Sequence, residues 1–184
     1  MMTGVLFEGS EANLGQCEET FSQRGVSVEQ VRELIADARD AAVNSYAPYS
    51  HFNVGVAGVF EAQNGSILLT SGANQENAAF SPVQCGETVA IARARMEGYH
   101  TIRVLAVYGM PDSTVAADIR TAASKEWVAP CGRCRQVINE TASEDCIIIF
   151  VRGDDKIMIV TFAALFPFAF GPKNLGIDPA DYRV

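Results

Sequence analysis

The sequence predicts a layered α/β domain, and two observations indicate it. Segments with a helical spacing of apolar residues alternate along the chain with short apolar runs that are typical of buried strands. The length of 184 residues and the 48% share of hydrophobic residues suit one globular domain with a sizeable core. We therefore expect the order α-β-β-α-β-α-β, with one further strand near the end of the chain.

The first 26 residues predict a loose N-terminal extension, because they mix Gly, Ser, Glu and Gln without a sustained hydrophobic period. We expect one catalytic domain over residues 27–184. Its first helix should begin after Ser27, a residue type that is favoured at the N-cap. Apolar residues follow at spacings of three and four from Val28 to Val43, and Pro48 ends the pattern.

A β-hairpin is expected after this helix. Residues 52–60 are rich in Val and aromatic residues, the turn signal Asn64-Gly65 follows, and residues 66–70 resume an apolar run. Helix-forming residues then dominate residues 85–96. The sequence therefore predicts two paired strands followed by a helix.

The second half of the chain continues the alternation. Gly98 is a helix stop signal, and residues 102–108 predict a buried strand after it. Residues 136–141 predict a helix, and β-branched residues in 146–151 predict the next strand. The last strand is expected at residues 156–160. Both cysteine motifs then fall at the N-termini of neighbouring helices.

Three cysteines and a glutamate form a pattern that is typical of a catalytic zinc site. Cys85-Gly86-Glu87 comes first, and Cys131 and Cys134 follow in a second motif. Three thiolates leave the fourth tetrahedral position of zinc open for water or substrate, whereas a structural site closes all four positions with protein atoms. The positive end of a helix dipole also favours thiolate over thiol. The pattern therefore predicts a zinc hydrolase.

The charge of such a site requires compensation. Three thiolates around a dication leave one negative charge, which opposes the ionisation of a bound water molecule. Arg133 lies between two ligands and Arg135 follows them. We favour Arg133 as the residue that compensates the charge through hydrogen bonds to sulfur.

Charge and composition exclude several classes of partner. A net charge of -8 and a pI near 4.7 would repel a phosphate backbone, so the expected partner is a small molecule and not a nucleic acid polymer. The sequence shows neither a signal-peptide pattern nor a long apolar run, so we expect a cytoplasmic protein without membrane contact. A reducing compartment would also keep the five cysteines available for metal.

Other functions remain open for these residues. The spacing of Cys131 and Cys134 also serves thiol-disulfide oxidoreductases. A non-catalytic zinc-binding module is a further alternative, in which Glu87 would only stabilise a helix dipole. A closed structural site would need a fourth protein ligand. The candidates for that ligand are Cys17, Cys146, His51 and His100.

Five segments, in this order along residues 28–176, resemble the small, three-cysteine type of the cytidine deaminase family. They are Tyr46–Gly55, Gly72–Phe80, Cys85-Gly86-Glu87, Pro130–Val137 and Leu165–Pro172. The resemblance implies a central mixed β-sheet flanked by helices on both faces, in a homotetramer with one Zn²⁺ per subunit. It implies hydrolysis of the 4-amino group of cytidine, deoxycytidine or a modified cytosine nucleoside, in pyrimidine salvage. A blasticidin S deaminase-like aminohydrolase is the runner-up.

The resemblance also implies roles for the zinc-site residues. Cys85, Cys131 and Cys134 would hold zinc. Glu87 would take a proton from the attacking water, protonate the ring nitrogen and later deliver a proton to the departing ammonia.

The remaining implied roles concern the substrate. Asn74 and Glu76 would hydrogen-bond the sugar hydroxyls, and Phe52 would line the base pocket. The backbone N–H of Gly86 would contact the base. Phe170 matches an aromatic residue that reaches a neighbouring subunit's site in such tetramers.

The chain departs from the family pattern in three ways. Gly86 and Thr88 stand where the family usually carries alanine and arginine, which removes a common partner of the thiolates. We expect the missing methyl group at Gly86 to widen the space beside the base. Residues 112–128 also form an insertion before the second cysteine motif.

Overall fold

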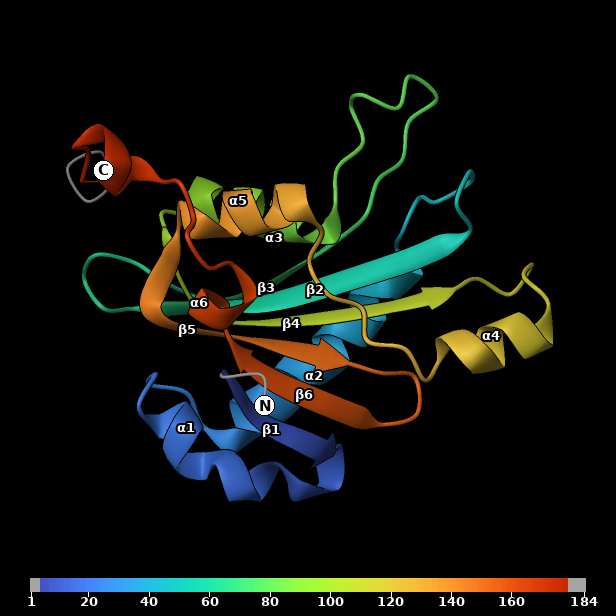
Figure 1. Ribbon diagram of the computed structural model, residues 1–184, viewed down its shortest axis with the longest axis horizontal. Helices are drawn as coiled ribbons and strands as arrows, with labels where there is room; N and C mark the ends of the chain where they lie inside the picture. The colour runs from blue at the N-terminus through green and yellow to red at the C-terminus, as the bar shows by residue number, and fades with distance from the viewer. Residues whose placement is uncertain (1–3, 179–184) are drawn as a thin grey trace.

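A six-stranded mixed sheet with the strand order β1-β6-β5-β4-β2-β3 forms the centre of the molecule (Figure 1). The structure, a computed structural model, describes residues 4–178. β4 and β5 pair in parallel, and the other neighbours pair antiparallel. The strands are β1 (Val5–Ser10), β2 (Phe52–Glu61), β3 (Ile67–Ala73), β4 (Thr101–Pro111), β5 (Ala142–Val151) and β6 (Lys156–Thr161).

Helices cover both faces of this sheet, which confirms the expected fold class (Figure 1). α2 (Val28–Val43) packs on one face, and α3 (Gly86–Met96) and α5 (Gly132–Asn139) pack on the other. The shorter elements are η1 (Glu11–Cys17), α1 (Glu18–Ser22), α4 (Ala117–Ala123), α6 (Phe162–Leu165) and η2 (Pro172–Leu175). Within the described residues, no helix combines the length and apolar character that a membrane span requires.

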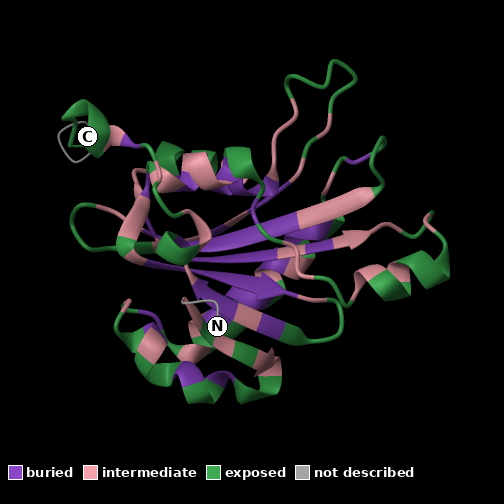
Figure 2. Ribbon diagram, in the orientation of Figure 1, coloured by how far each residue is buried: buried purple, intermediate pink, exposed green. Residues whose placement is uncertain are grey.

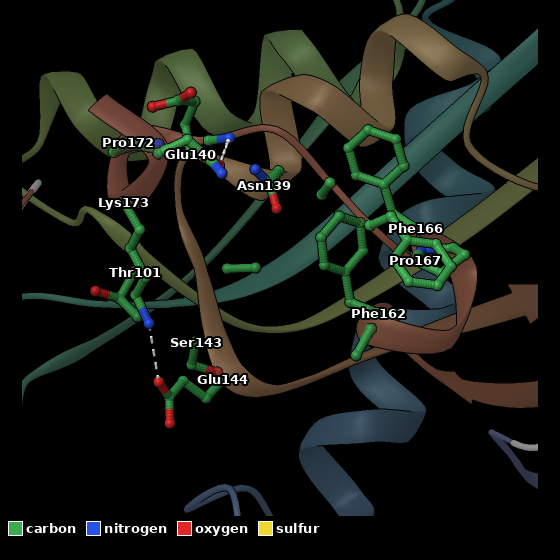
Figure 3. A pocket seen from close by; sticks show the side chains of 16 residues that line it. Thr101, Asn139, Glu140, Ser143, Glu144, Phe162, Phe166, Pro167, Pro172 and Lys173 are labelled. Carbon is green, nitrogen blue, oxygen red and sulfur yellow. Dashed lines mark hydrogen bonds and ion pairs between the residues drawn. The ribbon is translucent and has the colours of Figure 1, made fainter. Parts of the chain in front are cut away.

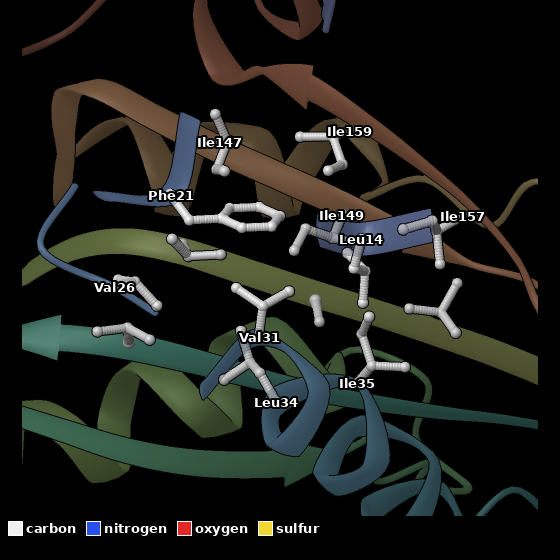
Figure 4. Packing of buried hydrophobic residues seen from close by; sticks show 14 of the residues in the cluster. Leu14, Phe21, Val26, Val31, Leu34, Ile35, Ile147, Ile149, Ile157 and Ile159 are labelled. Atoms are coloured by element: carbon white, nitrogen blue, oxygen red, sulfur yellow. The ribbon is translucent and has the colours of Figure 1, made fainter. Parts of the chain in front are cut away.

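The alternation of side chains along the central strands divides the core into two layers, one on each face of the sheet. Figure 2 shows that the central strands are largely buried, and Figure 4 shows side chains of the layer on the α2 side. In β5, Ile147 and Ile149 face the α2 side, whereas Ile148 and Phe150 face the side of α3 and α5. This follows from the two-residue period of a strand. Central strands that are buried on both faces are continuously apolar, which explains why the isoleucine run predicts a strand correctly.

Local signals place the first predicted helix and hairpin correctly. The Ser27 hydroxyl accepts a hydrogen bond from the N–H of Gln30 at 3.1 Å, and the Gln30 side chain accepts one from the N–H of Ser27 at 2.9 Å. This reciprocal pair is a capping box. β2 and β3 form the predicted hairpin, and Gly65 in its turn has φ +80°. Gly supplies this backbone conformation without steric strain.

The prediction of a loose N-terminal extension is wrong for residues 5–26. β1 pairs with β6 at the edge of the sheet, and η1 and α1 follow it. Leu14 and Phe21 are buried in the core on the α2 side (Figure 4). The segment shows no single hydrophobic period because it contains three short elements with different periods. Residues 1–3 lie outside the described residues. The assignment of residues 27–184 to one catalytic domain stays a prediction.

Candidate active site

Two helix N-termini bring the cysteine motifs together. Cys85 is the N-cap of α3 and Cys131 is the N-cap of α5, both with extended backbone, and Cys134 lies in the first turn of α5. Neither N-cap side chain makes a capping hydrogen bond. The first-turn N–H groups of both helices therefore keep their positive potential toward the sulfur atoms, which favours thiolate.

The sulfur geometry fits zinc. The Sγ atoms of Cys85 and Cys131 lie 3.9 Å apart, and the sulfur atoms of Cys85, Cys131 and Cys134 all lie within 4.8 Å of one another. A tetrahedral zinc site with Zn–S bonds of about 2.3 Å places its sulfur atoms about 3.8 Å apart. All five cysteines are free thiols. The predicted ligands thus form a ready donor set.

The candidate fourth ligands lie elsewhere in the described structure. Cys146 is buried in the sheet, and Cys17 lies in the core on the opposite face. His51 Nδ1 lies 3.2 Å from Asp112 Oδ2. Among the described residues, the metal-ligating cluster consists of the three cysteines alone. The observed donor set is therefore that of an open site.

The thiols of the cluster influence one another. A hydrogen bond from the Cys134 thiol lowers the pKa of Cys85 to about 6, against the opposing effects of burial and the Glu87 carboxylate. The same hydrogen bond, with burial, raises the pKa of Cys134. This hydrogen bond thus favours the thiolate form of Cys85 and the thiol form of Cys134. Zinc binding releases such protons, because the ligand is the thiolate.

Glu87 lies in the first turn of α3 with only 3% of its surface exposed. Burial raises the pKa of its carboxyl group, and hydrogen bonds with its own backbone N–H and with Cys134 partly offset this rise. A carboxyl group with a raised pKa exchanges protons more readily near neutral pH. The buried carboxyl group of Glu87 can therefore both accept and donate a proton beside the sulfur atoms.

Two arginines hold the loops around the cluster. Arg133 Nη1 donates a hydrogen bond to the carbonyl of Val83 at 2.8 Å, and its charge is a minor influence that favours the Cys85 thiolate. Arg135 donates to the carbonyls of Pro130 at 2.9 Å and Leu165 at 3.0 Å. The hydroxyl of Thr88 is buried without a hydrogen-bond partner among the described residues. The hydrogen bond described for Arg133 goes to a backbone carbonyl and not to sulfur, so charge compensation by Arg133 stays a prediction.

A cavity of about 280 Å³ opens beside the cysteines. Five predicted substrate or catalytic residues line it. They are Phe52, Asn74, Glu76, Gly86 and Glu87. Sequence reasoning did not identify several further wall residues, among them Val54, Val107, Val128 and Ala129. Val128 and Ala129 stand directly before the second cysteine motif in the sequence, and this position is the one signal that indicates a place near the site.

Hydrogen bonds already fix the two polar residues at one end of the cavity. Asn74 Oδ1 accepts from the N–H of Val54 at 2.8 Å, and its Nδ2 donates to the carbonyl of Phe52 at 3.0 Å. Glu76 Oε2 accepts from the N–H groups of Tyr49 at 2.9 Å and Ser50 at 3.2 Å. Although burial acts in the opposite direction, these bonds and one from the Ser50 hydroxyl lower the pKa of Glu76. Glu76 thus presents an ionised carboxylate.

The expectation that Gly86 widens the space beside the base is wrong. A Cβ atom at this position would lie 3.0 Å from Val56 Cγ2 and within 3.4 Å of the carbonyl oxygens of Gly72 and Val54. It would therefore point toward the sheet, against which the first turn of α3 packs. Gly86 contributes to the cavity wall through its backbone.

Phe170 does not line this cavity. Its side chain is 60% exposed, and its carbonyl accepts hydrogen bonds from Gln136 Nε2 at 3.0 Å and Asn139 Nδ2 at 3.2 Å. The neighbouring segment borders a separate cavity of about 640 Å³. Figure 3 shows the rings of Phe162 and Phe166 on one side of it. The Phe170 side chain is thus exposed at the surface, and its role in substrate binding stays a prediction.

Comparisons with known proteins agree with this arrangement. A family model described as the cytidine and deoxycytidylate deaminase zinc-binding region matches residues 28–150. The chain is 34% identical to a cytidine deaminase of Sporosarcina psychrophila, over 79% of this chain and 94% of that relative. A cytidine deaminase of Halalkalibacterium halodurans is 32% identical, over 77% and 95%. The solved cytidine deaminase of Burkholderia pseudomallei is 27% identical with a TM-score of 0.57, over 76% of this chain and 98% of that chain.

Proposed function

The chain belongs to the cytidine and deoxycytidylate deaminase family, and we infer that it is a zinc-dependent hydrolase that converts cytidine or deoxycytidine to the uridine product and ammonia. Zn²⁺ is its cofactor, with one ion per subunit. The observation that carries this conclusion is the cluster of three sulfur atoms beside the buried Glu87, at the wall of a nucleoside-sized cavity. Zinc supplies the activation of water as a nucleophile at such a site.

Glu87 performs the proton transfers of the proposed reaction. Its carboxylate takes a proton from the attacking water and gives it to N3 of the base, which makes C4 more electrophilic. After the water oxygen has added to C4, Glu87 takes the proton of the new C4 hydroxyl group and delivers it to the 4-amino group. The C4–N bond then breaks, ammonia leaves, and C4 becomes the carbonyl carbon of the uridine product. The raised pKa supports both roles, because the carboxyl group both accepts and returns protons near neutral pH.

The shape of the cavity supports one orientation of the nucleoside. The base lies with C4 at the sulfur cluster and one face against Phe52, while the sugar lies toward Asn74 and Glu76. Asn74 has one Nδ2 hydrogen beyond its bond to Phe52, and Glu76 has its second carboxylate oxygen. A donor and an ionised acceptor suit sugar hydroxyls, which both donate and accept.

We also propose that the enzyme is a cytoplasmic homotetramer in pyrimidine salvage, whose Phe170 completes a neighbouring subunit's site. Phe170 supports this proposal together with Phe168, Leu175 and Ile177, which are also exposed in the same stretch of chain, because exposed apolar patches mark interaction surfaces. The net charge of -8 supports free nucleosides as substrates over polynucleotides.

A nucleoside panel tests the proposed function. Zinc-loaded protein should decrease the absorbance of cytidine and deoxycytidine near the cytosine band and release ammonia. Glu87→Gln should lower kcat about 10²- to 10⁴-fold while zinc content is unchanged, because the neutral amide cannot exchange protons.

Direct competition separates the alternatives. A preference for blasticidin S over cytidine would favour the runner-up aminohydrolase. Reversible oxidation of Cys131 with Cys134, with little metal in the purified protein, would favour a thiol-disulfide oxidoreductase. Full activity of Glu87→Gln would contradict the proton-transfer role.

A further inference from the structure

The insertion before the second cysteine motif builds one wall of the cavity. Val128 and Ala129, next to its end, line this cavity together with Phe52. Gly109 of β4 lies beneath both Phe52 and Val128. A Cβ atom there would lie 2.8 Å from Phe52 Cε1 and 3.0 Å from Val128 Cγ1. The two side chains thus lie over the same point of the sheet, and both line the cavity.

A stacking contact anchors this wall. The guanidinium carbon of Arg152 lies 4.8 Å from the centroid of the Trp127 ring, within the range of a cation–π interaction. Arg152 Nη2 also donates to Asp154 Oδ2 at 2.6 Å. Arg152 has a side-chain exposure of only 17%, so the contact is partly removed from solvent. This contact therefore ties Trp127, the residue before Val128, to the turn between β5 and β6.

A second contact connects the insertion to the same turn. A Cβ atom at Gly153 would lie 3.0 Å from Ser124 Cβ and 3.0 Å from Met110 Sδ. Ser124 is the C-cap of α4, so the end of this helix packs closely on the turn. The insertion is thus held at α4 and again at Trp127, directly before the cavity wall.

The chemistry of cytosine indicates which edge of the base meets this wall. The inference rests on the proposed function, in which Glu87 protonates N3. N3 and C5 are the two ring neighbours of C4, so C5 lies on the side of C4 away from Glu87. Val128 and Ala129 lead directly to Cys131, the ligand on the other helix. In the proposed orientation of the base, with N3 toward Glu87, the C5 edge would therefore face the Val128 wall.

We propose that Val128 determines which C5 substituents the enzyme accepts, and that Trp127, stacked on Arg152, is the positioning residue that holds Val128 in place. The substrate class that the wall selects is cytosine nucleosides with hydrogen at C5. A methyl group at C5 meets the Val128 side chain, and the anchored backbone does not retreat from it.

Steady-state rates on cytidine and 5-methylcytidine test the role of Val128. The wild-type protein should prefer cytidine. Val128→Ala should raise the ratio of kcat/KM for 5-methylcytidine to that for cytidine about 10-fold, which is the effect of one methyl-sized change in an apolar pocket. Val128→Leu should lower the same ratio, because the longer side chain leaves less room for a C5 methyl group. If Val128→Ala does not fold, Val128→Leu still tests the proposal. Ile119→Ala, at an exposed position of α4, is the matched control and should leave the ratio unchanged.

The positioning role of Trp127 has its own readout. Trp127→Leu should raise the same ratio although Val128 is intact, with the main change in KM and with zinc content unchanged. Trp127→Phe, which restores an aromatic face for Arg152, should return the ratio toward the wild-type value. A Trp127→Phe ratio equal to that of Trp127→Leu would contradict the positioning role.

Two failures are distinguishable. An active enzyme whose ratio is the same in wild type, Val128→Ala and Val128→Leu overturns this inference alone. A zinc-loaded wild-type protein that deaminates neither nucleoside overturns the proposed function together with it.

Discussion

Burial determines the behaviour of Glu87, because a carboxylate in this position loses most of its hydration. Its residue type and its place after Cys85 indicate a proton shuttle, but its 3% exposure and raised pKa come from packing against the sheet. Because burial disfavours the ionised carboxylate, it also lowers the free energy of unfolding of the metal-free protein at neutral pH.

Glu87→Gln should therefore stabilise the metal-free protein at neutral pH. A carboxyl group whose folded pKa is raised gives its full stability below its unfolded pKa of about 4.3 and loses it as the pH rises through the folded pKa. Each unit of the rise costs about 1.4 kcal/mol at neutral pH, and the amide removes this penalty. The free energy of unfolding, measured in chelator at pH 7 and pH 4, should show the gain only at pH 7.

Glu126→Gln is the matched control for this comparison, because Glu126 is exposed and the same substitution there removes no buried carboxylate. A Glu87→Gln protein with the same free energy of unfolding as wild type at pH 7 would contradict the expectation.

At the scale of elements, each short N-terminal segment contributes to the core although none shows a long periodic pattern. Phe21 of α1 has 0% exposure and belongs to the same cluster as Val31 and Ile147 (Figure 4). Arg39 of α2 forms ion pairs with Glu11 and Asp155, which connect η1 to the turn between β5 and β6. The N-terminal segment is thus part of the layer that supports the sheet from the α2 side.

Phe21→Ala should lower the free energy of unfolding by about 3 to 5 kcal/mol, because it removes a buried aromatic ring and leaves a cavity. Denaturant titration measures this change. Leu6→Ala is the control, because Leu6 of β1 is 45% exposed and should cost much less. A loss below about 1 kcal/mol for Phe21→Ala would indicate that the segment packs only loosely.

At the scale of the whole molecule, the two ends of α5 have different surroundings. Its N-terminus carries two of the three zinc ligands, while its C-terminal half binds the carbonyl of Phe170 through Gln136 and Asn139. The ring of Phe170 lies outside the cavity of its own subunit. In the proposed homotetramer, it would complete a different subunit's site.

Subunit mixing tests this assembly. Phe170→Ala and Glu87→Gln homotetramers should each have low activity, whereas mixed tetramers should regain part of it. In a mixed tetramer, a subunit with intact Glu87 receives an intact Phe170 from its neighbour. Activity after co-expression, together with the sedimentation coefficient, measures the effect.

Phe168→Ala is the control for the mixing experiment, because Phe168 is also an exposed aromatic residue. It should not require complementation. Mixed tetramers no more active than the average of the two parents would refute the exchange of Phe170.

Local patterns were sufficient to predict much of this fold. Ser27, the hairpin turn at Gly65 and the isoleucine run of β5 act through a few neighbouring residues, so their effects are visible in sequence. Two of the three cysteines can also be placed from local sequence, because Cys131 and Cys134 share one helical turn. The positions of the two cysteine motifs at adjacent helix starts were therefore correctly predicted.

Tertiary structure alone decided the remaining features. The pairing of β1 with β6, the direction in which Gly86 faces the sheet and the meeting of Phe52 with Val128 over Gly109 all join residues far apart in the chain. Such contacts depend on the register and packing of the complete sheet, which no local window contains. Residue type and spacing therefore indicate the chemistry of the three cysteines and Glu87, whereas long-range packing shapes the cavity beside them.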